Sequence, residues 1–341
     1  MVLNDFHCHF YTYDSGVVMD KIITYISARN ITLMDPVLPA MEMPRTCFGA
    51  KNLHQCNQEQ GISVGLILNN IREKGLWEKG TEFSLSISRN NLKITPFIGI
   101  HPWDSTDASK EIINSLEEIS SKTGAFIGEF GFDKLKGADK EKQLYLFRNC
   151  LDIALKTEKP FTIHCVRSWG LLTEELQKVK NRIKAPFIIH AYSGSAEAAK
   201  TITELGGYPS FGLERYGAFS RKAEESISKI DLKHLLLETD FTCYSKQPPD
   251  ASGLQQDDKG LYGTEQCSSN DNRAAEQDNG CENSINVEYS KEDNYYGKKY
   301  LKRLLAVYNE AASVLKMDIT ELSGVIEENG KVFKAYTANR K

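Results

Sequence analysis

The sequence predicts an α/β fold whose parallel strands either form a sheet covered on both faces or close into a barrel. Two observations support this: short apolar runs recur along the chain, and segments with helical periodicity separate them. Continuous apolar runs are typical of strands buried on both faces, and intervening helices make successive strands parallel. The eight expected strands cover residues 2–6, 62–68, 94–100, 125–129, 160–164, 186–190, 207–211 and 235–238.

The segments between these strands show the spacing of amphipathic helices. Residues 142–156 carry apolar side chains three and four positions apart, a stripe that packs on a sheet, and Pro160 follows as a helix breaker. The same spacing predicts a long helix over roughly 298–315 and a short terminal helix over 329–336.

The length of 341 residues allows two or three small domains or one large enzyme fold. With 40% hydrophobic and 26% charged residues, the composition is that of a folded globular protein. We expect one domain formed by residues 1–244 and 297–341. Between them, residues 245–296 carry eleven acids and four bases with little apolar patterning, which predicts an acidic, disordered insertion.

Charge and targeting signals narrow the class of protein. The net charge of −4 excludes a basic nucleic-acid coat, so a polyanionic substrate needs a local site. No stretch reaches the roughly 20 apolar residues of a membrane span and no signal peptide is evident, so we expect a cytoplasmic protein without membrane contact. The eight cysteines form no C-x-x-C pair, which favours free thiols. The absence of P-loop and Rossmann motifs predicts no nucleotide cofactor.

Several side chains that can bind metal lie where predicted strands end. The carboxyl ends of strands in a β/α barrel meet at one rim, where active sites are built. In His7-Cys8-His9 both imidazoles lie on one side of an extended chain, because alternate residues of a strand share a face. Nitrogen and oxygen ligands together suit Zn, Mn or Mg. The candidate ligands are His7, His9, Glu129, His164, His190 and Asp240.

Each of these residues also has an ordinary structural interpretation. An aspartate at a strand end often caps the next helix, and a lone buried histidine is more often a hydrogen-bonded core residue. The H-x-H pattern alone is weak support for a metal site. The six residues together, in the order of the strands, favour a metal site.

Five groups of motifs follow one another along the chain: Asp5–His9, Gly99–Trp103, Ile127–Asp133, Ile163–Arg167 with Ile189–Gly194, and Leu236–Asp240. Together they resemble the TatD family of metal-dependent hydrolases, which are TIM-barrel members of the amidohydrolase superfamily. The resemblance implies a single-domain TIM (β/α)8 barrel with the long acidic insertion after its eighth strand. The insertion has no counterpart in the family pattern.

The resemblance also implies how the candidate residues act. Two divalent ions (Zn, Mg or Mn) would be bound, one by His7, His9 and Asp240 and the other by His164 and His190. Glu129 would bridge the two ions and, with Asp240 as the general base, serve catalysis.

Two further residues, His101 and Arg167, match family positions that lie at the substrate phosphate. A turn fixed by Pro102 and a surface ion pair are their alternative interpretations. Many relatives have His-x-Arg where this chain has His164-Cys165-Val166-Arg167, and the extra residue changes where the arginine points.

The activity that the resemblance implies is hydrolysis of phosphodiester bonds at DNA ends, with DNA or another phosphodiester as substrate. Hydrolysis of an ester, amide or lactone is the alternative, because the same ligands serve those reactions in the wider superfamily. A non-catalytic barrel that binds a partner protein is the third possibility. Without the insertion the chain carries a net charge of +3, which predicts few phosphate contacts and a modest salt dependence of DNA binding.

Overall fold

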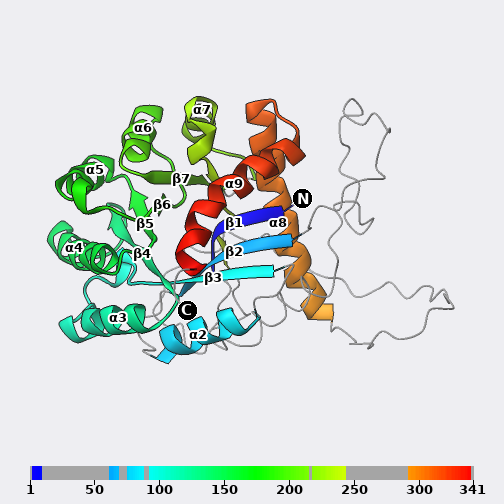
Figure 1. The fold of residues 1–341 in the computed structure, drawn as a ribbon. Helices are drawn as coiled ribbons and strands as arrows, with labels where there is room; N and C mark the ends of the chain where they lie inside the picture. The colour runs from blue at the N-terminus through cyan, green and yellow to red at the C-terminus, as the bar shows by residue number, and fades with distance from the viewer. Residues whose placement is uncertain are drawn as a thin grey trace, which may run out of the picture.

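A ring of parallel strands surrounded by helices dominates the computed structural model, which describes residues 2–9, 61–68, 75–87, 92–214, 217–242 and 291–338 (Figure 1). The strands are β1 Val2–His9, β2 Gly61–Leu68, β3 Leu92–Ile98, β4 Phe126–Asp133, β5 Phe161–Val166, β6 Phe187–Ile189, β7 Gly207–Phe211, β8 Leu236–Leu237 and β9 Phe241–Thr242.

Strand pairing shows that the sheet curves back on itself. The order is β8-β7-β6-β5-β4-β3-β2-β1-β9, and every neighbouring pair is parallel. The short segments β8 and β9 are three residues apart, and they pair with β7 and β1 respectively. Together they take the place of an eighth strand, and the predicted (β/α)8 barrel is confirmed.

Three strands continue beyond their expected ends, toward the carboxyl rim. β1 runs to His9, β4 to Asp133 and β5 to Val166, whereas the apolar runs stop at Phe6, Glu129 and His164. Every residue of β4 is buried, the glutamate included. A polar side chain therefore ends an apolar run in the sequence without ending the strand, because at these positions the side chain faces a polar site within the barrel.

Helices follow most strands and cover the outside of the barrel (Figure 1). In α4, Phe147 and Leu151 of the expected stripe are buried, and Asp139 caps the helix by accepting from the Lys142 amide. The helices in this part of the chain are α2 Gly75–Ile87, α3 Lys110–Lys122, α4 Lys140–Thr157, α5 Trp169–Lys178, α6 Ala196–Glu204 and α7 Arg221–Lys229, with short 3-10 turns η1 Pro102–Asp104, η2 Lys180–Arg182 and η3 Leu232–His234.

Two long helices complete the chain, α8 Lys291–Leu315 and α9 Ile319–Ala338. Both begin earlier than the sequence predicts, and residues 291–296 of the expected insertion belong to α8. Residues 291–296 were expected in the insertion because of their polar composition, but polar residues also occur in helices. Residues 243–290 lie outside the described residues, so the disorder of the insertion and its domain boundaries stay predictions.

Helix α9 packs across the amino-terminal end of the barrel. Ser323 Oγ donates to the Val2 carbonyl at 2.7 Å, and Asn329 Nδ2 donates to the Leu235 carbonyl at 2.8 Å. The Phe333 ring packs against Phe6 with centroids 5.9 Å apart. This face therefore stabilises the barrel, and the opposite, carboxyl rim presents the candidate ligands. None of the helices in the described ranges combines the length and the apolar character of a membrane span.

Candidate metal centre

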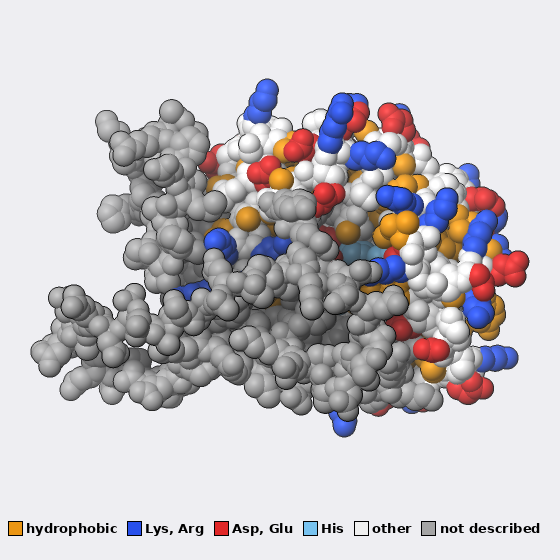
Figure 2. Space-filling view, turned by 180° about the vertical axis from the view of Figure 1, so that it is seen from behind, with side chains coloured by type: hydrophobic (Ala, Val, Ile, Leu, Met, Phe, Trp, Pro, Cys, Tyr) orange, Lys and Arg blue, Asp and Glu red, His pale blue; other side chains and the backbone are white. Residues whose placement is uncertain are grey.

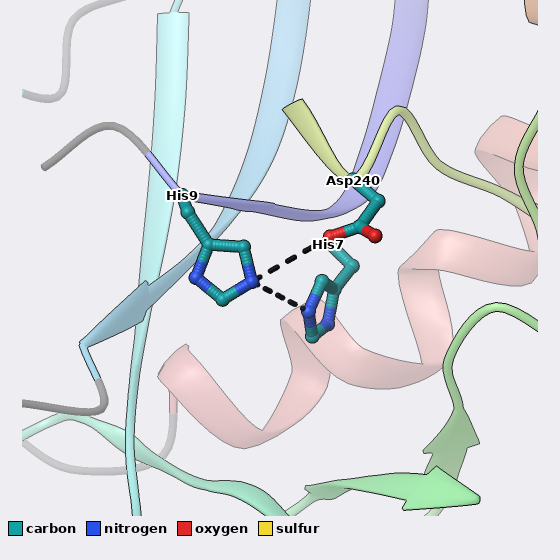
Figure 3. Close-up of side chains that lie close together, drawn as sticks. All are labelled: His7, His9 and Asp240. Carbon is teal, nitrogen blue, oxygen red and sulfur yellow. Dashed lines mark hydrogen bonds and ion pairs between the residues drawn. The ribbon is translucent and has the colours of Figure 1, made fainter. Parts of the chain in front are cut away.

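The first ligand cluster joins β1 to the segment that closes the barrel. His7 Nε2 and His9 Nε2 lie 3.2 Å apart, and His9 Nε2 lies 3.6 Å from Asp240 Oδ1 (Figure 3). The Asp240 amide donates to the His7 carbonyl at 3.0 Å, which holds the aspartate beside the two imidazoles. His7 is fully buried, whereas the Asp240 side chain is 44% exposed. The cluster therefore opens to solvent on the Asp240 side.

The second cluster gathers around Glu129. Its Oε2 lies 3.0 Å from His190 Nε2, 3.6 Å from His164 Nδ1 and 3.6 Å from His7 Nε2. Its Oε1 lies 3.7 Å from His9 Nε2. The structure thus brings all six predicted ligands into one mouth, and Glu129 is the member that reaches histidines of both clusters.

The spacing of the imidazole nitrogens fits metal ligation. Two nitrogens bound at about 2.0–2.1 Å to one tetrahedral ion lie roughly 3.3 Å apart. The His7–His9 pair is at 3.2 Å, and His164 Nδ1 and His190 Nε2 are at 2.9 Å. Three groups of two histidines and one carboxylate have ligand atoms within 4.8 Å of one another: His7, His9 and Asp240; His7, His190 and Glu129; and His101, His164 and Glu129. The residues therefore fit divalent ions, with the nitrogen and oxygen ligands that Zn, Mn and Mg take.

Burial and neighbouring charges set the protonation of this cluster. Burial, assisted by His190, holds the pKa of His7 well below its ordinary value, so His7 is neutral and offers a lone pair. Burial also acts to raise the pKa of Glu129, but the attraction of His190 outweighs it and holds this pKa well below its ordinary value. Glu129 is therefore a carboxylate at neutral pH, as a bridging ligand requires.

Carboxylates outside the cluster orient two of the histidines. Glu238 Oε1 lies 3.3 Å from His190 Nδ1, and Asp133 Oδ2 lies 3.4 Å from His164 Nε2. Burial acts to lower the pKa of both histidines, but Glu129 together with Glu238 holds the pKa of His190 well above its ordinary value, and Asp133 together with Glu129 raises that of His164. Each imidazole has its remaining nitrogen directed toward Glu129. Pairing of a ligand histidine with an outer carboxylate is common in metal sites and fixes the ring orientation.

Residues of α8 hold the backbone next to Asp240. Thr239 donates its amide and its hydroxyl to buried Asp5, at 2.9 and 2.7 Å. Tyr300 of α8 donates to the same carboxylate at 2.9 Å, and Arg303 Nε donates to the Thr239 carbonyl at 2.7 Å. Asp240 is therefore held from β1 on one side and from α8 on the other.

His101 lies beside Glu129, but it uses one ring nitrogen to accept a backbone hydrogen bond. Its Nε2 is 3.7 Å from Glu129 Oε1, but its Nδ1 accepts a hydrogen bond from the Trp103 amide at 3.2 Å. Burial lowers the pKa of His101 to about 3, so the ring is neutral, and an accepting Nδ1 leaves the proton on Nε2. Nε2 then presents a donor, which suits an anionic substrate better than a metal ion.

Arg167, the other predicted substrate contact, follows β5 at the rim. Its side chain is exposed, and within the described residues it forms no ion pair. The alternative interpretation as a surface ion pair therefore finds no support there. The residue has a positive φ of 53°, so the chain turns sharply directly after the strand.

A (β/α)8 barrel with histidines and carboxylates converging at its carboxyl rim defines a metal-binding member of the TIM-barrel class. Comparison with known families identifies it further: a model described as TatD related DNase matches residues 4–333. The chain belongs to this family.

Individual relatives agree with that assignment. The uncharacterized metal-dependent hydrolase YabD of Bacillus subtilis is 30% identical over 156 residues, which cover 44% of this chain and 60% of YabD. Deoxyribonuclease Tat-D of Schizosaccharomyces pombe is 23% identical over 186 residues, covering 51% of this chain and 59% of that protein. The matched segments thus span about 60% of these relatives.

Solved structures support the fold. The TatD homologue YjjV of Escherichia coli superposes with a TM-score of 0.58 at 16% identity, covering 97% of each chain. A TatD-family hydrolase of Entamoeba histolytica gives a TM-score of 0.53 at 18% identity, covering 80% of this chain and 84% of the other.

Sequence reasoning missed the residues that orient the ligands. Asp133 and Glu238 lie within the motifs that it singled out but received no role. Glu238 carried a signal, because an acid directly after three leucines is expected to be buried and then requires a partner. No sequence signal marked Arg303 or Tyr300, since their contacts depend on how α8 is placed against the barrel.

Proposed function

We propose that this chain is a divalent-metal-dependent phosphodiesterase that acts on DNA ends. The observation that carries the proposal is the convergence of four histidines and two carboxylates, Glu129 and Asp240, at the carboxyl rim, with nitrogen pairs at ligand spacing. The name of the fission yeast relative, a deoxyribonuclease, supports the choice of DNA.

The ligands divide into two sets in this proposal. His7, His9 and Asp240 would hold one ion and His164 and His190 the second, with Glu129 shared between the two sets. Ions bound there would lower the pKa of a water molecule and neutralise charge on the phosphate. The buried members provide rigid ligands, whereas Asp240 remains accessible from solvent.

Three side chains of this chain then act on the reactants. Asp240 accepts the proton of the attacking water, because it is the half-exposed carboxylate of the site and lies 3.6 Å from His9 Nε2. His101 donates through Nε2 to a phosphate oxygen. Arg167, exposed at the rim, pairs with phosphate oxygens through its guanidinium. An exposed guanidinium at the rim favours a phosphate ester over a neutral amide or lactone.

The test combines metal analysis with a substrate screen. Purified protein is assayed for bound Zn, Mn and Mg and for hydrolysis of single-stranded DNA, blunt duplex DNA, RNA and a simple carboxyl ester. We expect bound divalent metal and release of nucleotides from DNA ends. Metal-loaded protein that hydrolyses the carboxyl ester but no phosphodiester would overturn the proposal.

A pair of variants links activity to the site. Glu129→Gln keeps the size of the side chain but removes the charge that faces the histidines, so hydrolysis should be abolished and bound metal reduced. Glu175→Gln is the matched control, because Glu175 is also a buried acid but pairs with Arg148 on the outside of the barrel. It should keep both metal and activity.

A further inference from the structure

Trp103 lies at the rim directly beside the candidate metal centre. Its side chain is 48% exposed, whereas Trp77 is buried. The centroid of the Trp103 ring is 4.6 Å from that of His101 and 6.4 Å from that of His164. A single exposed apolar side chain needs no functional explanation. The position of this one, next to the residues that would contact the substrate, suggests that it contacts the substrate too.

The indole is also held in a fixed orientation. Trp103 Nε1 donates to Asp133 Oδ2 at 2.7 Å, and Asp133 Oδ1 accepts from the amides of Leu135 and Lys136 at 2.8 and 3.0 Å. A Cβ added to Gly137 would lie 3.2 Å from the Trp103 Cα, so the loop after β4 packs closely against η1. A ring that is already ordered loses little conformational entropy when a ligand stacks on it.

Basic residues accompany the ring. Lys136 Nζ lies 4.5 Å from the centroid of the Trp103 ring, and Lys134 is exposed on the same loop. Figure 2 shows a small area of exposed histidine surface with basic and hydrophobic side chains beside it. Sites for single-stranded nucleic acids combine aromatic side chains that stack on bases with cations that contact the backbone.

We propose that Trp103 and Lys136 form a subsite for the nucleoside phosphate next to the bond that is hydrolysed, a proposal that rests on the proposed function. The base stacks on the indole, and the Lys136 ammonium binds the adjoining phosphate. The ammonium lies over the ring in the free protein, but an exposed cation–π contact is weaker than a base stack. The base therefore displaces the ammonium, which stays within reach of the phosphate.

The test measures binding and does not depend on turnover. Metal-loaded protein is titrated by calorimetry with thymidine 5′-monophosphate and with 2-deoxyribose 5-phosphate, which lacks the base. We expect the nucleotide to bind about 5- to 150-fold more tightly, the range for one base–aromatic stack. Trp103→Leu should abolish this preference. Tyr145→Leu, which removes another exposed aromatic from α4, should leave the preference unchanged.

Two more variants separate the parts of the subsite. Trp103→Phe keeps a ring for stacking but loses the bond to Asp133, so it should retain part of the base preference. Lys136→Met should lower the salt dependence of single-stranded DNA binding by about 0.7 in log–log slope, the value for one phosphate contact.

The outcomes distinguish this subsite from the proposed function. If the wild type binds the nucleotide and the base-free sugar phosphate with equal affinity, the subsite proposal is wrong. The proposed phosphodiesterase function is not affected by that result. Loss of bound metal in Trp103→Leu and Trp103→Phe alike would also overturn the subsite proposal, because the ring would then act through Asp133 and His164. A base preference without any phosphodiesterase activity would support the subsite and refute the proposed function.

Discussion

Removing the carboxylate of Glu238 should weaken metal binding although Glu238 is not itself a proposed ligand. Its Oε1 accepts from the Ala191 amide at 2.7 Å and lies 3.3 Å from His190 Nδ1, and its side chain is fully buried. Without this acceptor the His190 ring loses both its fixed orientation and the partner that places the proton on Nδ1.

The expected size follows from these contacts. Loss of an outer partner of a ligand histidine costs about 10- to 100-fold in metal affinity, or about 1.4–2.7 kcal/mol. Glu238→Ala should reach this range and also destabilise the fold by about 1.5–3 kcal/mol, since the Ala191 amide loses its charged acceptor. Glu238→Gln keeps an oxygen for both donors and removes only the charge, so its effect on affinity should be smaller.

The assay is calorimetric titration of metal-free protein with Zn²⁺ and Mn²⁺ at pH 7, alongside urea denaturation. Glu175→Ala serves as a matched control, because it removes a buried carboxylate from α5 outside the site. It should lower stability and leave metal affinity unchanged. If Glu238→Ala folds and binds metal as tightly as the wild type, the assigned role of Glu238 is wrong.

Four further perturbations test other parts of the molecule. Arg167→Ala should raise KM for DNA and leave bound metal unchanged, and equal metal loss would contradict its role as a phosphate contact. Arg303→Ala removes charge-assisted bonds to the Thr239 and Leu213 carbonyls, so urea denaturation should show a loss of about 3 kcal/mol together with weaker metal binding. The hydrogen bond from Arg148 lowers the pKa of Glu175 from 4.5 to about 2 despite some desolvation. The ionised Glu175 therefore stabilises the folded state fully above pH 4.5, and this stabilisation is lost as the pH falls through 2. The difference in free energy of unfolding between the wild type and Glu175→Gln should accordingly shrink between pH 5 and 2. Replacing residues 246–290, which hold nine acids and three bases, with a Gly/Ser linker should speed DNA association at low salt, and slower association would show that the segment recruits substrate.

Strand positions were predictable because burial on both faces leaves continuous apolar runs, and all eight runs correspond to strands or to the closing segment. The candidate ligands were predictable for a related reason. Residues at the carboxyl ends of parallel strands must share a rim, so the chain order alone brings His164 and His190 to His7. The extents of β1, β4 and β5 were not predictable, because a buried polar side chain in a functional site looks like the end of an apolar run.

Contacts between distant segments explain most of what the sequence did not reveal. The Glu238–His190 contact joins residues 48 positions apart, and the Tyr300–Asp5 bond joins residues 295 positions apart. Periodicity shows that α8 is amphipathic, but it does not specify which turn meets which strand. The role of Arg303 beside Thr239 therefore follows only from the three-dimensional packing.

Backbone conformation adds an independent reason to place function at the carboxyl rim. Five described residues other than glycine have positive φ, and two of them, Glu158 and Lys316, directly follow helices, where this conformation is common. The other three, Arg167, Ala191 and Asp240, follow the three strand segments β5, β6 and β8. Such a conformation costs about 1–3 kcal/mol and persists where surrounding contacts enforce it. Those contacts are present here, because the Ala191 amide is bound by Glu238 and the Asp240 amide by the His7 carbonyl. The strain thus lies beside His190 and at Asp240 itself, where the turn between β8 and β9 keeps the ligand at the mouth of the barrel.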